Sequence, residues 1–169
     1  FYGRYHPTAG PVSSDDMAYD IGRITRKGSD RLFEFSFRLA AQRKRRNPRK
    51  GRVTCVDKAN VHRGFALMRK VFWDVAKRHP DIAAADAYVD AMALDLVRRP
   101  WDFDVLPTEN QFGDILSDLG AALVGGMGLA PSADVGEKHG LFQPAGGTAP
   151  DIAGKGIANP TAMFLSAAM

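Results

Sequence analysis

Two aspartates, Asp114 and Asp118, stand four residues apart in an amphipathic segment that opens with Phe112 and Gly113. On a helix, side chains at this spacing lie on one face. Two such carboxylates repel each other and gain nothing from a hydrophobic core, whereas a divalent cation such as Mg²⁺ or Mn²⁺ binds oxygen ligands. Taken alone, the pair is also typical of a solvated helix face. Evidence from other segments of the sequence is needed to distinguish a metal site from a solvent-exposed helix face.

The composition is that of an ordinary globular chain. It has 169 residues, of which 45% are hydrophobic and 25% are charged. No run approaches the roughly 18 apolar residues that would cross a bilayer. The single cysteine, Cys55, excludes an internal disulfide framework and is typical of a reducing compartment, so we expect a cytoplasmic protein with no membrane partner.

Both ends of the sequence suggest a piece of a longer polypeptide. The chain begins with Phe1 and Tyr2 instead of a methionine. It closes on an apolar helical segment that follows Asn159, a good N-cap, and Pro160, which suits the first helical position. No C-cap follows that segment, and we therefore expect a fragment.

Hydrophobic periodicity predicts helices that alternate with strands. Helices are expected from Ser29 to a basic run and over residues 61–75, 91–97 and 114–124, and strands over residues 52–56, 82–89 and 103–106. This alternation indicates an α/β architecture. Residues 1–28 lack a helical period and are expected to form an arm, and a glycine-rich change of texture predicts a domain boundary near Val124.

The basic run at residues 43–52 supplies much of the net charge of +4. Such a cluster could contact the phosphates of a nucleic acid. However, no aromatic residue lies within it, no nucleic-acid-binding signature accompanies it, and Pro48 and Gly51 mark a turn. We interpret it as a solvated turn between a helix and a strand, and we expect no nucleic-acid partner.

Five segments, in this order, resemble the β-decarboxylating dehydrogenases, which comprise isopropylmalate, isocitrate, homoisocitrate and tartrate/D-malate dehydrogenases. They are residues 53–61 (VTCVDKANV), 88–93 (YVDAMA), 108–118 (TENQFGDILSD), 128–133 (GLAPSA) and 147–160 (GTAPDIAGKGIANP). The resemblance implies the two-domain α/β fold of isopropylmalate and isocitrate dehydrogenases, here as an incomplete fragment. Residues 1–124 would belong to the small domain, with dimerisation, metal and substrate sites, and residues 125–169 to the large NAD-binding domain.

The resemblance further implies a homodimer whose active sites are shared between subunits. Asp114 and Asp118 would bind Mg²⁺ or Mn²⁺ together with Asp90 from the neighbouring subunit. Lys58, also from that subunit, would accept the proton of the substrate's 2-hydroxyl group. Tyr2 would protonate the enolate left after CO₂ departs, and Asn60 would join Tyr2 and Lys58 in binding the substrate.

Simpler interpretations of three of these residues stay open at this point. A lysine at a strand end, such as Lys58, is usually a solvent-facing charge, although a desolvated lysine beside a metal can act as a base. Asp90 could be only the N-cap of the helix that follows it. Tyr2 could be an ordinary amphipathic tyrosine. In the family the catalytic tyrosine follows a glycine and an apolar residue, and only the apolar residue, Phe1, is present here.

The glycine-rich segment bears on the cofactor. It contains neither G-x-G-x-x-G nor a Walker pattern. Its small residues nevertheless admit close backbone approach, and Asp151 can accept hydrogen bonds from both ribose hydroxyls while repelling a 2′-phosphate. In the family an acidic residue here accompanies NAD, with Gly147, Ala149, Asp151 and Asn159 as the matching cofactor-binding residues.

Two positions depart from the family pattern. Gly146 stands in place of a histidine that stacks on the adenine, and Gln143 stands in place of a glutamate. These departures motivate one alternative from another class, a catalytically inactive regulatory subunit, which the presence of Lys58 and all three aspartates disfavours. We expect NAD-dependent, metal-assisted oxidative decarboxylation of a 2-hydroxy-3-carboxy acid.

The identity of that acid stays open between relatives. Residues 88–93 are most similar to isopropylmalate dehydrogenases, whereas residues 24–29 (ITRKGS) are closer to isocitrate, homoisocitrate and tartrate/D-malate dehydrogenases. We place 3-isopropylmalate first.

Overall fold

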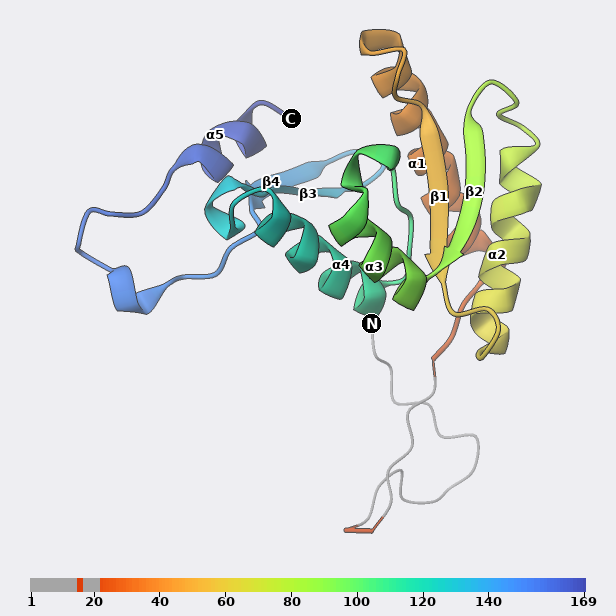
Figure 1. Cartoon of the computed structure of the whole chain (residues 1–169), viewed down its shortest axis with the longest axis horizontal. Helices are drawn as coiled ribbons and strands as arrows, with labels where there is room; N and C mark the ends of the chain where they lie inside the picture. The colour runs from red at the N-terminus through yellow and green to blue at the C-terminus, as the bar shows by residue number, and fades with distance from the viewer. Residues whose placement is uncertain (1–14, 17–21) are drawn as a thin grey trace. The chain divides into compact units, whose positions relative to one another are not determined.

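The structure is a computed structural model that describes residues 15–16 and 22–169 (Figure 1). The chain divides into two units, which we describe separately. Unit 1 comprises the chain up to Val89 together with Trp101–Thr108, and unit 2 comprises Asp90–Pro100 and Glu109–Met169. The predicted small and large domains, which meet near Val124, refer to the whole enzyme and stay a prediction.

Unit 1 consists of a parallel strand pair and two helices. Its elements are α1 (Arg26–Arg46), β1 (Arg52–Asp57), α2 (Arg63–Ala76) and β2 (Ala83–Tyr88). The register of the two strands runs from the pair Arg52 and Ala83 to the pair Asp57 and Tyr88. The two helices pack on each other and on β1. The predicted helix–strand alternation is therefore confirmed in this unit.

The core of unit 1 lies between these helices and β1. Phe33 and Phe37 of α1 meet Phe72 of α2, with ring centroids 5.2 Å and 5.6 Å apart. All three rings are fully buried, as are Val53 and Cys55 on β1. Burying a phenylalanine side chain stabilises the fold by roughly 1.5–3 kcal/mol, so this cluster holds β1 firmly against the helices.

Helix α1 begins earlier than predicted. Thr25, in an extended conformation, is the N-cap, and its Oγ1 accepts a hydrogen bond from the Gly28 N–H at 3.2 Å. The predicted N-cap, Ser29, is instead buried within the first turn. The last three residues of the predicted arm, 26–28, therefore belong to the helix. Residues 1–14 and 17–21 of the predicted arm lie outside the described residues.

The basic run is only partly a turn. Its first four residues form the last turn of α1, where positive charge interacts favourably with the carbonyl end of the helix. Arg43 pairs with Asp104, and the Lys44 ammonium donates to the carbonyl of Asp81. The interpretation as a turn is therefore wrong for residues 43–46, because α1 continues through them.

Other predicted elements also differ from the structure. Helix α4 (Asn110–Leu123) begins four residues before Asp114, because Glu109 caps it. Helix α3 (Val89–Arg98) contains Asp90 in its first turn, so the N-cap interpretation of Asp90 is wrong. In residues 103–106, only Val105 forms a bridge, beside Val53 of β1.

Unit 2 contains α3, α4 and a C-terminal hairpin with its helix. The remaining elements are η2 (Met127–Leu129), β3 (Pro131–Val135), β4 (Gly140–Pro144), η3 (Pro150–Ile152) and α5 (Thr161–Ala167). η1 (Pro100–Asp102) follows α3 where the sequence passes from unit 2 to unit 1. β3 and β4 pair antiparallel, and α5 packs on both strands. Within the described residues, no helix has the length and apolar character required to cross a membrane.

Candidate active site

Asp114 and Asp118 lie exposed on α4, as their spacing predicts. Both line an open hollow of about 440 Å³, together with Ser117 of the same helix and with Ser132 and Gln143 of the hairpin. The Asn110 side-chain amide donates to Asp114 Oδ2 at 3.0 Å. Both aspartates, one turn apart on α4, therefore border the same hollow.

This set of donors fits a hard divalent cation. The hollow offers two carboxylates, hydroxyl groups and an amide, and Mg²⁺ and Mn²⁺ prefer such oxygen ligands. In the described part of a single chain, no group of three or more His, Cys, Asp or Glu side chains gathers at metal-binding distance. The role of Asp90 as a third ligand, contributed by a neighbouring subunit, stays a prediction; Asp90 is exposed in α3.

Lys58 directly follows the end of β1, and its side chain is half-buried. Its carbonyl accepts hydrogen bonds from the N–H groups of Val61 and His62, at 3.0 Å and 3.1 Å. Its ammonium nitrogen lies 5.9 Å from the centroid of the Tyr88 ring. Asn60 is exposed in the same turn. Tyr2 lies outside the described residues, so its catalytic role stays a prediction.

The segment that enters α4 holds two polar atoms that sequence reasoning did not single out. Glu109 Oε1 caps α4 by accepting from the Gln111 N–H at 2.8 Å. Its other carboxylate oxygen, and the hydroxyl of Thr108, are buried and have no hydrogen-bond partner within the described residues. Leaving such atoms unsatisfied is costly. The only sequence signal was an acidic residue just ahead of the helix.

A second hollow, of about 460 Å³, lies beside the glycine-rich loop. It brings together three of the predicted cofactor-binding residues, Gly147, Ala149 and Asn159. The fourth, Asp151, is exposed in η3 and is not among the lining residues. The two hollows share four lining residues, and these are Met127, Gln143, Pro144 and Gly146.

Backbone conformation singles out the same loop. Ala149 has φ 43°, and it is the one residue other than glycine with positive φ in the described part of the chain. Such a conformation costs roughly 1–3 kcal/mol and is concentrated at functional sites. Asn159, at the other end of the loop, accepts a hydrogen bond from the Thr161 N–H through its Oδ1 at 3.0 Å. The predicted capping is displaced by one residue, because Pro160 is the N-cap and α5 begins at Thr161.

Known proteins match this chain throughout. A family model described as isocitrate/isopropylmalate dehydrogenase matches residues 2–169. The chain is 53% identical over 147 residues to the 3-isopropylmalate/3-methylmalate dehydrogenase of Methanocaldococcus jannaschii, covering 86% of this chain and 44% of that protein. It is 51% identical over 156 residues to the homoisocitrate dehydrogenase of the same organism, covering 92% and 43%.

A solved structure gives the same answer for the fold. The crystal structure of isocitrate dehydrogenase from Methylococcus capsulatus superposes with a TM-score of 0.84 at 43% identity, covering 94% of this chain and 47% of that one. The chain thus spans less than half the length of these relatives, and the predicted α/β fold of this group is confirmed. The chain belongs to the isocitrate/isopropylmalate dehydrogenase family of oxidoreductases.

Proposed function

We propose that the chain is part of an NAD-dependent, divalent-metal-assisted dehydrogenase that oxidatively decarboxylates a 2-hydroxy-3-carboxy acid, with 3-isopropylmalate as the first candidate. One observation carries the proposal. The hollow that holds Asp114 and Asp118 adjoins the hollow at the glycine-rich loop, with Gln143 and Gly146 lining both. A metal-bound acid and a dinucleotide would therefore be neighbours.

The residues of the chain would divide the chemistry among them. Asp114 and Asp118 would hold Mg²⁺ or Mn²⁺, with Asp90 of a second copy, and the bound cation would supply Lewis-acid polarisation of the substrate's oxygens. Lys58 would hold the proton that leaves the 2-hydroxyl group when the carbon is oxidised. Tyr2 would return a proton to the substrate carbon after CO₂ is lost.

The choice of acid rests on the relatives. Three of the similar proteins, from Methanocaldococcus jannaschii, Archaeoglobus fulgidus and Thermotoga maritima, are named as dehydrogenases of 3-isopropylmalate, at 46–53% identity. Isocitrate and homoisocitrate also occur among the names, as the alternative substrates. Asp151, a negative charge on the cofactor loop, favours NAD over NADP because it would repel a 2′-phosphate.

Exposed apolar side chains support the homodimer. Leu94 and Val97 on α3 are 56% and 59% exposed, and Ile115 on α4 is 58% exposed. Exposed apolar side chains mark protein–protein interfaces where they gather into a patch. A second copy that covers α3 and α4 would bury these residues. It would also contribute its own Lys58 and Asp90 to the active site of the first copy.

The test uses the full-length enzyme after treatment with a chelator. We expect NAD reduction with 3-isopropylmalate only after Mg²⁺ or Mn²⁺ is restored. We expect the Asp114→Asn variant to bind Mn²⁺ more weakly in isothermal titration and to gain less activity when the metal is added. Turnover that does not need metal would contradict the mechanism. Isocitrate, homoisocitrate and D-malate, assayed side by side, decide the substrate.

The same titration separates an enzyme from an inactive regulatory subunit. We expect the intact dimer to bind both Mn²⁺ and NAD, whereas an inactive subunit that has lost its site would bind neither. The departures at Gln143 and Gly146 would then be adjustments of affinity and not signs of a lost site.

A further inference from the structure

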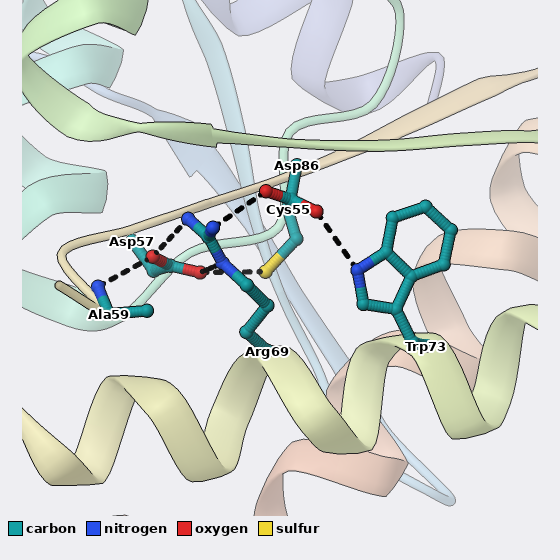
Figure 2. Close-up of polar contacts among 6 residues, drawn as sticks. All are labelled: Cys55, Asp57, Ala59, Arg69, Trp73 and Asp86. Carbon is teal, nitrogen blue, oxygen red and sulfur yellow. Dashed lines mark hydrogen bonds and ion pairs between the residues drawn. The ribbon is translucent and has the colours of Figure 1, made fainter.

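Asp57 is fully buried at the end of β1, immediately before Lys58, and four donors surround its carboxylate (Figure 2). Oδ1 accepts from the Ala59 N–H at 2.8 Å and from Arg69 Nη2 at 2.7 Å. Oδ2 accepts from Arg69 Nε at 2.8 Å and from the Cys55 thiol at 3.8 Å. Because a buried carboxylate is tolerated only when it is paired and hydrogen-bonded, Arg69 fixes where this one lies.

Arg69 also reaches the neighbouring strand. Its Nη1 pairs with Asp86 Oδ2 at 2.7 Å, and Asp86 Oδ1 in turn accepts from Trp73 Nε1 at 2.9 Å. Its guanidinium carbon lies 4.7 Å from the centroid of the Tyr88 ring. The hydrogen bond with Asp57 raises the pKa of Arg69 further above its ordinary value, so the group stays charged. One guanidinium therefore ties α2 to both strands.

Strand register and helix spacing bring these residues together. Cys55 is paired with Asp86, and Asp57 with Tyr88, in the parallel ladder. Residues two apart on a strand share a face, so all four point toward α2. Arg69 and Trp73 stand four apart on that helix, which places both over the same stretch of the sheet.

This network controls the backbone around Lys58. The bond from the Ala59 N–H to the Asp57 carboxylate spans two residues and closes an Asx turn with Lys58 at its centre. The Lys58 carbonyl, on the other side of that turn, accepts from Val61 and His62. The Lys58 ammonium lies near the same Tyr88 ring that Arg69 contacts.

We propose that Arg69 is a positioning residue for Lys58, acting through the Asp57 carboxylate and the Tyr88 ring. The inference rests on the proposed role of Lys58 as the base. Arg69 does not touch the substrate. It holds the turn that aims Lys58, and it does so with a fork of parallel hydrogen bonds that a lysine cannot form.

The test compares Arg69→Lys with Arg78→Lys in the full-length enzyme. Arg78 also pairs with two carboxylates, those of Asp30 and Glu34 at 2.6 Å and 3.0 Å, in a more exposed position, and takes no part in the network. For Arg69→Lys we expect kcat to fall about 10-fold to 100-fold, because small misplacement of a reacting group has effects of this size. The KM for NAD should stay within about twofold, since the cofactor loop is untouched.

A kinetic isotope effect separates positioning from a merely structural role. With substrate deuterated at the carbon that is oxidised, Arg69→Lys should raise the isotope effect on kcat, because a misaligned base makes the chemical step limiting. Arg78→Lys should lower the melting temperature and leave the isotope effect at the wild-type value. If Arg69→Lys does not fold, Asp86→Asn decides by the same two measurements, with an expected loss of about threefold to tenfold in kcat.

The inference is overturned if the folded variant keeps kcat within about twofold of wild type, or if its isotope effect is unchanged. Lys58→Met, measured in parallel, keeps this failure distinct from failure of the proposed function. If Lys58→Met retains wild-type kcat, the proposed base is wrong. If Lys58→Met is inactive while Arg69→Lys is unimpaired, only the positioning role of Arg69 is wrong.

Discussion

Gly146 lies where the two hollows meet, at the position that carries an adenine-stacking histidine in the family pattern. A Cβ at Gly146 would meet only Met127 Cβ, at 3.7 Å, which is an ordinary van der Waals contact. Its φ is not in the left-handed region, so a side chain is compatible with its backbone. A Cβ is therefore tolerated at this position, which borders both hollows.

We predict that Gly146→His tightens NAD binding. A restored stacking contact is worth about 1 kcal/mol, which corresponds to roughly a fivefold lower Kd. Isothermal titration of the full-length enzyme with NAD measures it. Gly146→Leu, which fills the same space without a π-face, is the matched control and should gain less. Equal affinity for the histidine variant and wild type would show that the cofactor does not stack there.

Cys55 offers a second prediction at the scale of one residue. The thiol is fully buried in the core of unit 1, and burial raises its pKa far above the ordinary range, with the nearby Asp57 charge adding to the effect. We predict that in native protein the thiol reacts at pH 8 at least about 100-fold more slowly with a disulfide reagent than in denaturing urea. Fast labelling of the native thiol would contradict the burial of β1.

The sign of the pH dependence follows from the same shift. The folded state keeps the thiol protonated, whereas the unfolded state ionises it at its ordinary pKa. The free energy of unfolding should therefore be unaffected by this group at neutral pH and fall as the pH rises above about 9. Cys55→Ala, measured by urea denaturation over the same pH range, should lack this component.

At the scale of elements, internal positions were predictable and ends were not. Met68, Phe72 and Val75 are buried on α2, as their helical period predicts, because that period reflects one packed face. The start of α1 was misplaced because Thr25 competes with Ser29, a plausible later cap, and backbone conformation decides between them. The start of α4 was misplaced because the cap that Glu109 provides was not recognised. Residues 103–106 read as a strand, yet only Val105 bridges to β1.

The turn before β1 permits a direct test of backbone strain. Gly51 has φ 99°, and a Cβ there would lie 2.7–2.9 Å from three carbons of the Lys44 side chain. Its N–H donates to Asp104 Oδ2 at 2.8 Å, which fixes its position. We predict that Gly51→Ala lowers the free energy of unfolding by about 1–3 kcal/mol. Urea denaturation, with an unchanged m-value, measures it.

At Gly120, the same substitution to alanine is expected to change the free energy of unfolding in the opposite direction. It lies within α4, its φ is ordinary, and a Cβ there would have nothing within 4 Å. Because alanine favours a helix over glycine, Gly120→Ala should raise the free energy of unfolding by up to about 1 kcal/mol. If both variants moved stability in the same direction, the strain assigned to Gly51 would be wrong.

At the scale of the whole molecule, the sequence predicted residues of a candidate site but could not predict the contacts that support them. The spacing of Asp114 and Asp118 sufficed to place them together, since local helix geometry determines that. The contacts of Arg69 with Asp57 and Asp86 join residues 12 and 17 positions away in the chain, and no local pattern reports them. The unpartnered oxygen of Glu109 is likewise visible only once burial is known.

The shared active site is the largest claim at this scale, and mixed dimers test it. If Lys58 of one subunit serves the Asp114 of the other, a dimer of Lys58→Met and Asp114→Asn chains holds one intact site and one doubly damaged site. Random mixing of equal amounts makes about half of the dimers mixed, so we predict about a quarter of wild-type activity from two inactive parents. Asp114→Asn mixed with Asp118→Asn is the control and should restore nothing, because each site then keeps one damaged carboxylate. No recovery in the first mixture, with mixed dimers verified by mass spectrometry, would place Lys58 and Asp114 in the same chain's site and contradict the sharing.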